Sequence, residues 1–198
     1  MRTLILLTLL VALVAADACD TSYLLDASQP SPSDQLSVAE INAILKAHND
    51  ERRIVSPPAK VMPMLQWDQS LADFAKEYMG TCIGMVHSSS SQRKNTTRFG
   101  FSYVGENLAA GYGGTRYSLN EGGVTSTLAW NAEKSDYTYS SGACSAVCGH
   151  YTQAVWYGTT HVGCGYAYCP DEPYKNYWSC NYGPGGNYNG QKPWAEAT

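Results

Sequence analysis

The sequence of 198 residues is poor in charge and has a single long apolar stretch. Only 15% of its residues are charged, and the formal net charge is −4. No basic cluster is larger than the pairs Arg52–Arg53 and Arg93–Lys94, so the phosphates of nucleic acid have no electrostatic partner. The apolar run Leu4–Val14 is too short to span a bilayer. The composition therefore argues against nucleic acid as a partner and against a transmembrane segment.

The sequence also lacks the compact motifs of common hydrolases. It contains neither the Gly-x-Ser-x-Gly turn of serine hydrolases nor the His-Glu-x-x-His helix of zinc proteases. Ser88, which follows His87, is the one obvious candidate for a nucleophilic hydroxyl. Adjacent residues of an extended segment point apart, so we expect Ser88 to be polar loop surface. No catalytic residue is predicted, and a metal-dependent protease is the less favoured alternative.

The first 18 residues have the layout of a secretory signal peptide. Arg2 precedes the apolar run and small residues follow it, so cleavage is expected after Ala16 or Ala18. The mature protein is then expected to be secreted into an oxidising, extracellular environment. Residues 19–36 are polar and interrupted by prolines, and we expect them to form a flexible leader.

Seven cysteines argue for disulfide bonds in that environment. Six of them lie between Cys82 and Cys180 and allow 15 pairings, while Cys19 is left over. Asn95 opens the sequon Asn-Thr-Thr within a polar stretch. We therefore expect Asn95 to be glycosylated in a surface loop over residues 88–97.

Apolar periodicity predicts helices in the first two thirds of the chain. Ser37 and Glu40 have the spacing of a capping box, and a 3.6-residue period follows over residues 38–54. Residues 68–80 repeat the pattern behind an aspartate N-cap. A third helix is expected over residues 124–134.

Strand patterns dominate the last third. Aromatic and β-branched residues predict strands over residues 151–157, 162–169 and 174–182. His150 would lie immediately before the first strand, and the side chains along that strand would alternate between two faces. Residues 105–110 are expected to be a short turn or helix, and the tail from residue 183 to be irregular. Helices followed by antiparallel strands predict an α+β domain with helices packed over a small sheet.

Four stretches together resemble the motifs of one protein family. They are His48–Arg52, Gly105–Ala109, Gly149–Trp156 and Tyr177–Asn187. In this order they resemble the CAP superfamily of cysteine-rich secretory, antigen 5 and pathogenesis-related class 1 proteins, most of all its plant and fungal members. The resemblance implies a disulfide-stapled, three-layer α-β-α sandwich with a small antiparallel sheet. The domain is expected over residues 37–194, with residues 195–198 as a tail.

The resemblance also implies a cleft built from four residues that are far apart in the sequence. They are His87, Glu106, Glu133 and His150. Imidazoles are good zinc ligands, and carboxylates orient them from behind. The resemblance thus implies a weakly bound divalent metal, such as zinc, on His87 and His150. The alternative is that the four side chains only hydrogen-bond one another and brace the fold.

Lipid binding is the function that the resemblance favours, because relatives bind sterols or hold fatty acids between two helices. The matching loop, residues 111–123, carries Tyr112, Tyr117 and Leu119 among five glycines. Aromatic walls and a loop that can open suit an apolar ligand. Asn120 stands where relatives have a further aromatic residue. The alternative is a glycine-rich surface loop whose tyrosines cover the helix below.

The resemblance implies one disulfide bond, Cys164–Cys180. It leaves open the pairing of the other four: Cys82, Cys144, Cys148 and Cys169. Sterols or fatty acids are the expected partners, in lipid export or host interaction. The alternative is signalling, through a cell-surface protein receptor or through a C-terminal peptide that begins at Pro184, since plant relatives release such a peptide.

Overall fold

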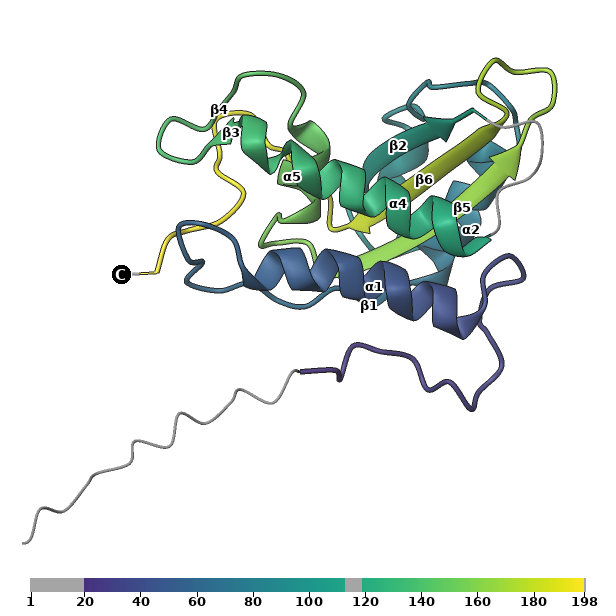
Figure 1. The fold of residues 1–198 in the computed structure, drawn as a ribbon, viewed down its shortest axis with the longest axis horizontal. Coiled ribbons are helices and arrows are strands. Elements are labelled where there is room, and N and C mark those ends of the chain that lie inside the picture. The colour runs from purple at the N-terminus through teal and green to yellow at the C-terminus, as the bar shows by residue number, and fades with distance from the viewer. Residues whose placement is uncertain (1–19, 113–118, 198) are drawn as a thin grey trace, which may run out of the picture.

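The computed structural model describes residues 20–112 and 119–197, which form three layers (Figure 1). The sheet lies between helices α1 (Val38–Arg53) and α4 (Leu119–Ala132) on one face and helix α2 (Gln69–Met79) on the other. Its four strands, in spatial order, are β1 (Gln66–Trp67), β5 (His161–Tyr168), β6 (Asn176–Gly183) and β2 (Gly105–Gly111). The predicted α-β-α sandwich is confirmed.

The sheet is mixed, so the expectation of a purely antiparallel sheet is wrong in one strand. β2, β6 and β5 are antiparallel neighbours, but β1 runs parallel to β5, with Gln66 opposite His161. β1 has two residues and no alternating pattern of its own. Its pairing depends on where the chain returns from α1, which local sequence does not encode.

The first two predicted helices are confirmed together with their caps. The Ser37 hydroxyl accepts a hydrogen bond from the Glu40 amide at 3.3 Å, and the Glu40 carboxylate accepts one from the Ser37 amide at 2.7 Å. Asp68 caps α2 in the same way by accepting a hydrogen bond from the Leu71 amide at 3.0 Å. Each cap satisfies an amide that the helix leaves without a partner.

Arg52 ties the buried side of α1 to distant parts of the chain. Arg52 is 1% exposed, and its guanidinium donates four hydrogen bonds of 2.9 Å to the carbonyls of Pro63, Ala154, Trp156 and Thr159. Burial lowers the pKa of Arg52 to about 9. One side chain thus joins α1 to the segment before β1 and to the connection that leads into β5.

The strand predicted over residues 151–157 is wrong, because Gly149–Ala154 form a short helix, α5. All its residues from Tyr151 to Ala154 are buried, so tertiary packing overrides the β propensity of Tyr and Thr. The Glu133 carboxylate also accepts hydrogen bonds from the amides of His150 and Tyr151. Amides in the first turn of a helix have no acceptor within the helix, so Glu133 supplies one. The side-chain alternation of a strand therefore does not apply, and His150 lies in the first turn of α5.

Residues 105–110, predicted as a turn or short helix, lie in the edge strand β2. All seven residues of β2 pair with β6. Glycine, asparagine and alanine are poor strand formers, so this strand is imposed by its neighbour. The loop before β2 contains two short helical turns, η1 (Gln92–Lys94) and α3 (Thr96–Phe99), and Asn95 is exposed between them.

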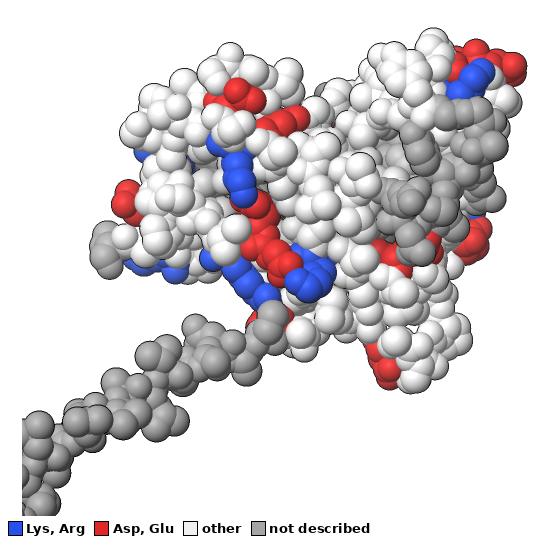
Figure 2. All heavy atoms as spheres, viewed as in Figure 1, with Lys and Arg blue, Asp and Glu red and all other residues white. Residues whose placement is uncertain are grey.

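The third predicted helix is shifted towards the N-terminus. α4 ends at Ala132 and continues as a 3-10 turn, η2 (Glu133–Asp136), before the hairpin of β3 (Tyr137–Thr138) and β4 (Ala143–Cys144). Figure 2 shows that acidic and basic side chains on the face of α1 and α4 follow one another in a single stripe. Most of the remaining surface in that view is uncharged.

Among the described residues, three disulfide bonds staple the fold. The predicted bond Cys164–Cys180 is confirmed and joins β5 to β6. Cys82–Cys169 ties the loop after α2 to the end of β5, and Cys144–Cys148 joins β4 to the start of α5. These bonds fit a protein of the extracellular environment.

The described part of the N-terminal segment packs on α1, although a flexible leader was expected there. Tyr23 is 5% exposed, and the Leu25 backbone exchanges two hydrogen bonds with the Asn42 side chain, at 2.8 and 2.9 Å. The predicted signal peptide and Cys19 lie outside the described residues. Within residues 20–112 and 119–197, no helix has both the length and the apolar character needed to cross a membrane.

The C-terminal tail is irregular, as predicted, but it is fixed to the domain. Trp194 is 2% exposed, and its indole nitrogen donates to the Pro57 carbonyl at 2.9 Å. Beyond it, Glu196 forms a β-bridge with Ala59. Residues 195–197, expected as a separate tail, therefore lie against the segment that follows α1.

Candidate functional site: two histidine–glutamate pairs and an apolar pocket

The four residues expected in one cleft form two histidine–glutamate pairs. His87, in the loop after α2, lies 2.8 Å from Glu106 of β2, measured from Nδ1 to Oε1. His150, in the first turn of α5, lies 2.6 Å from Glu133 of η2, again from Nδ1 to Oε1. The structure thus gives each histidine a carboxylate from a different element.

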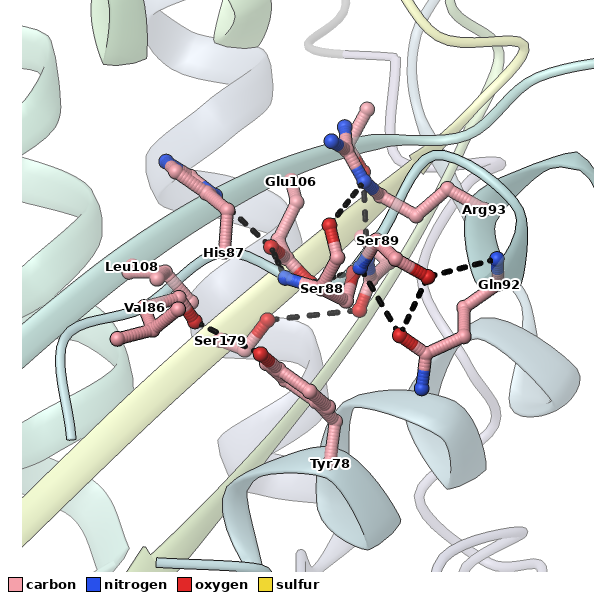
Figure 3. Close-up of polar contacts among 12 residues, drawn as sticks. Tyr78, Val86, His87, Ser88, Ser89, Gln92, Arg93, Glu106, Leu108 and Ser179 are labelled. Carbon is pink, nitrogen blue, oxygen red and sulfur yellow. Dashed lines mark hydrogen bonds and ion pairs between the residues drawn. The ribbon is translucent and has the colours of Figure 1, made fainter. Parts of the chain in front are cut away.

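Glu106 is a buried carboxylate with both oxygens engaged (Figure 3). Oε1 accepts hydrogen bonds from His87 Nδ1 at 2.8 Å and from the Ser88 amide at 2.9 Å, and Oε2 accepts one from the Ser88 hydroxyl at 2.7 Å. Its side chain is 0% exposed, whereas the His87 side chain is 53% exposed. Burial alone would raise the pKa of Glu106, but the hydrogen bonds from His87 and Ser88 outweigh burial and lower that pKa. The carboxylate therefore stays ionised while the imidazole reaches solvent.

Ser88 belongs to this cluster, so its expected place on the loop surface is wrong. It is 2% exposed, and the loop turns so that His87 and Ser88 reach the same carboxylate. Arg93 supports the loop by donating to the Ser88 carbonyl at 3.2 Å and to the Tyr103 hydroxyl at 2.7 Å. Because the Ser88 hydroxyl donates to a carboxylate instead of an imidazole, it is placed as an anchor and not as an activated nucleophile.

Glu133 holds both the ring and the backbone of His150. Oε1 pairs with the imidazole, and Oε2 accepts hydrogen bonds from the amides of His150 and Tyr151 at 3.1 and 3.3 Å. Trp130 stacks on the imidazole, with ring centroids 6.0 Å apart and planes 22° apart. Trp130 of α4 and Glu133 of η2, three residues apart, therefore contact the same histidine.

A buried chain of hydrogen bonds supports His150 from behind. Asn107 Nδ2 donates to the His150 carbonyl at 3.0 Å and to the Tyr182 hydroxyl at 3.1 Å. The Tyr182 hydroxyl lies 2.9 Å from Nε2 of His48 on α1, and burial lowers the pKa of His48 to about 4. These residues lie in the family motifs, but the motifs did not show that they touch.

The donor chemistry of the two pairs fits a metal ion only in part. In both histidines Nδ1 faces a carboxylate, which leaves Nε2 for a metal, as in many zinc sites. Two nitrogens are fewer than the ligands that zinc normally takes from protein. Across residues 20–112 and 119–197, no three His, Cys, Asp or Glu side chains are grouped so that they could hold a metal ion. The ligand types fit, and the ligand number is incomplete.

An apolar pocket of about 230 Å³ lies where β2 ends and α4 begins. It is lined by Ala109, Ala110, Gly111, Gly122, Thr125, Ser126, Ala129 and Trp178. Tyr112 follows directly after β2, is 70% exposed and has its ring 4.7 Å from that of Tyr174. Of the predicted lipid loop, Tyr117 and the Leu119 side chain lie outside the described residues, while the Leu119 backbone begins α4.

A second groove, of about 310 Å³, lies between α1 and α4. Ile54 and Leu128 line it and are 66% and 55% exposed. Lys134 and Glu51, which are 2.9 Å apart, form part of the charged stripe beside it (Figure 2). Asn131 also lines the groove; it is 5% exposed, and its Oδ1 has no partner among the described residues. The groove thus combines apolar walls with a charged rim.

The fold and these contacts define a disulfide-bonded α-β-α protein with two histidine–glutamate pairs. The family model for CAP, the cysteine-rich secretory protein family, matches residues 45–182. The chain is 36% identical over 163 residues to GLIPR1-like protein 1 of Bos taurus, covering 80% of this chain and 64% of that protein. It is 38% identical over 160 residues to cysteine-rich secretory protein 2 of Homo sapiens, covering 78% and 61%. The chain belongs to the CAP family.

The chain spans less than two thirds of the length of these two relatives. Among solved structures, it is similar to venom allergen-like protein 4 of Schistosoma mansoni, with a TM-score of 0.59 and 28% identity over 81% of this chain and 94% of that chain. It also superposes on NaASP2, which was solved with Zn²⁺, with a TM-score of 0.70 and 24% identity over 84% and 90% of the two chains. The likeness to NaASP2 concerns the fold alone.

Proposed function

We propose that this CAP protein is secreted and binds small lipids at the pocket between β2 and α4, with sterols as the favoured class. This binding would serve lipid export or host interaction. The observation that carries the proposal is the lining of that pocket, where small residues of β2 and α4 face Trp178. Pockets for apolar ligands combine such walls with few polar groups. Tyr112 stands directly beside the lining residue Gly111 and offers a further aromatic surface.

The size of the pocket indicates how such a ligand would bind. Its volume of about 230 Å³ is below that of most pockets for drug-sized ligands, which begin at roughly 300 Å³. It accommodates one end of a sterol, and the rest of the molecule would lie along Gly111 and Tyr112.

Equilibrium binding of labelled cholesterol to the purified mature protein tests this function. Replacing Tyr112 and Tyr117 by alanine should weaken binding at least about threefold, because aromatic contacts with the ligand are lost. Tyr188→Ala, which removes another exposed tyrosine from the C-terminal tail, should leave affinity unchanged. Failure to bind either cholesterol or palmitate at high protein concentration would rule the lipid function out.

A fatty acid is the second lipid that a specific observation favours. Ile54 and Leu128 are exposed in the groove between α1 and α4, where an acyl chain would cover both. Leu128→Asp should weaken binding of labelled palmitate and spare cholesterol, which uses the other pocket. Val147→Asp, at another exposed apolar residue outside the groove, is the matched control. Equal palmitate affinity of the wild-type protein, Leu128→Asp and Val147→Asp would exclude the groove as the binding site for palmitate.

The proposal includes a weakly bound divalent metal, such as zinc, on Nε2 of His87 and His150. Its support is the pairing of each Nδ1 with a carboxylate, which leaves both Nε2 atoms for a metal. NaASP2, which shares the fold, was solved with Zn²⁺. When bound, the metal would supply a positive charge that fixes the two rings, and no catalytic step is assigned to it. Calorimetric titration with zinc should give weak binding that His87→Ala abolishes and His161→Ala preserves. Zinc binding that survives His87→Ala would refute this assignment.

The signalling alternative divides into two cases. A released peptide beginning at Pro184 is disfavoured, because the Pro184 carbonyl accepts a hydrogen bond from Thr159, and Trp194 is buried. A receptor that contacts the folded surface is the other case. Mass spectrometry of culture fluid tests release by searching for that peptide. The same measurement on the intact protein tests cleavage after Ala16 or Ala18 and a glycan on Asn95.

A further inference from the structure

Trp178 carries a polar group that the fold does not use. Its side chain is 3% exposed, and its indole N–H has no hydrogen-bond acceptor among the described residues. By contrast, the buried Trp130 donates to the Leu108 carbonyl, and the buried Trp194 donates to the Pro57 carbonyl. A buried donor without an acceptor is unfavourable and uncommon in native proteins. Trp178 therefore departs from the pattern of these two tryptophans.

Gly122 of α4 packs against the N–H edge of this indole. A Cβ atom at Gly122 would lie 2.2 Å from Nε1 and 2.2 Å from Cε2 of Trp178, closer than real side chains approach. Glycine inside a helix is less favourable than alanine. Two unfavourable features, the helical glycine and the unused N–H, thus meet at one place. That place is the wall of the apolar pocket, which both residues line.

We infer that the indole N–H of Trp178 is the donor that selects the ligand of this pocket, and that the ligand is a hydrocarbon molecule with one uncharged oxygen acceptor, such as a sterol hydroxyl. The inference rests on the proposed lipid function and adds to it the chemistry of recognition. An indole N–H can only donate, so the ligand must supply the acceptor. The N–H is buried against the backbone of Gly122, which has no side chain, so the ligand oxygen would reach it by a small displacement of the first turns of α4.

The lining of the pocket explains why the oxygen is uncharged. None of the described lining residues is charged, and the hydroxyls of Thr125 and Ser126 are the other side-chain polar groups. A carboxylate brought into such a pocket would lose its hydration without gaining a cation from the described lining residues. The pocket is therefore assigned to an alcohol or ketone, whereas a fatty acid is assigned to the groove with the charged rim.

Competition against labelled cholesterol tests the role of the indole. For the wild-type protein, unlabelled cholesterol should compete at least about fivefold better than cholestane, which has the same ring system without the hydroxyl. In Trp178→Phe this preference should fall to about one, because phenylalanine keeps the apolar wall and removes the donor. Trp67→Phe and Ser126→Ala should keep the wild-type preference. Palmitate should not displace cholesterol from this pocket.

A second measurement does not depend on the folding of any variant. In isotope-labelled wild-type protein, the indole N–H resonance of Trp178 should move downfield with cholesterol and stay unchanged with cholestane. Equal affinity of wild-type protein for the two compounds, or a preference that persists in Trp178→Phe, would overturn the inference and leave lipid binding intact. If palmitate displaced cholesterol from the wild-type protein but not from Trp178→Phe, the indole would accept a charged oxygen. The assignment of an uncharged ligand oxygen would then be overturned. Absence of any binding by wild-type protein would overturn the proposed function and the inference together.

Discussion

Nε2 of His48 lies 2.9 Å from the hydroxyl of Tyr182, and both side chains are fully excluded from solvent. His48 Nδ1 lies 2.9 Å from the Ile44 carbonyl, so Nδ1 carries the proton and Nε2 accepts the hydrogen bond from Tyr182. The Tyr182 oxygen in turn accepts a hydrogen bond from Asn107. A protonated Nε2 would point its N–H at the Tyr182 hydroxyl, which already donates towards Nε2. The buried environment therefore keeps His48 neutral.

This pairing predicts that acidification destabilises the protein. Burial lowers the pKa of His48 from 6.5 to about 4. The unfolded chain binds the proton first as pH falls, so the contribution of His48 is present above pH 6.5 and is lost towards pH 4. We expect this group to lower the free energy of unfolding by up to about 3 kcal/mol over that range. Urea denaturation at a series of pH values measures the change.

A matched pair of variants isolates the buried imidazole. His48→Gln should lose much less stability on acidification than the wild-type protein, whereas the partly exposed His161→Gln should lose as much. The same slope in His48→Gln and in the wild-type protein would contradict the assignment.

Removing the Glu106 carboxylate should loosen the loop at Ser88. In Glu106→Ala the buried amide and hydroxyl of Ser88 lose their acceptor, which should cost about 1–3 kcal/mol of stability. Since the pKa of Glu106 is lowered, its contribution should also disappear as pH falls below the ordinary pKa of glutamate. Urea denaturation and hydrogen exchange of the Ser88 amide provide the readouts. Glu77→Ala, at a partly exposed ion pair with Arg98, should cost little, and equal losses in the two variants would argue against the anchor.

Arg52→Met should be among the most destabilising single changes in α1. It removes the donors of four buried carbonyls, and the expected loss is at least about 3 kcal/mol in urea denaturation. Arg52→Lys keeps a charge without the planar fork and should recover only part of that stability. Arg53→Met, at the more exposed neighbouring residue, is the control. A loss at Arg52 no larger than that at Arg53 would mean that the four hydrogen bonds contribute little.

The three disulfide bonds should differ in their contribution to stability, because they close loops of different length. The sequence separations are 87 residues for Cys82–Cys169, 16 for Cys164–Cys180 and 4 for Cys144–Cys148. Loop-closure entropy predicts losses of about 4.5, 3 and 2 kcal/mol when each pair is replaced by alanine. Urea denaturation of the three double variants measures the order. A larger loss of stability for Cys144–Cys148 than for Cys82–Cys169 would show that loop-closure entropy does not determine this order.

Sequence patterns predicted the elements whose own residues determine them. The capping box at Ser37 and Glu40 and the apolar stripe behind it are local, so α1 could be predicted from them. β2 and α5 could not, since both depend on partners far along the chain. β2 takes its conformation from β6, and α5 is stabilised by Glu133 and by the burial of its last four residues. Local propensity decides little where tertiary contacts are this dense.

The candidate site shows the same division. Histidines and carboxylates can be recognised as chemistry-bearing residues, and resemblance placed His87, Glu106, Glu133 and His150 near one another. Their division into two pairs depends on the loop that brings Ser88 to Glu106, 18 residues further along. The unused N–H of Trp178 is likewise visible only in three dimensions, because the same residue type elsewhere in the chain finds an acceptor.

The anchored C-terminus has a practical consequence. Residues 195–197 are held beside residues 58–60 at the left of Figure 1, while α4 begins at the right. The apolar pocket is lined by residues from the first turns of α4. A linker added after the last residue would leave the protein on the side away from that pocket. Coupling the protein to a sensor chip through its C-terminus should therefore give a layer of uniformly oriented molecules whose pockets all face the flowing solution.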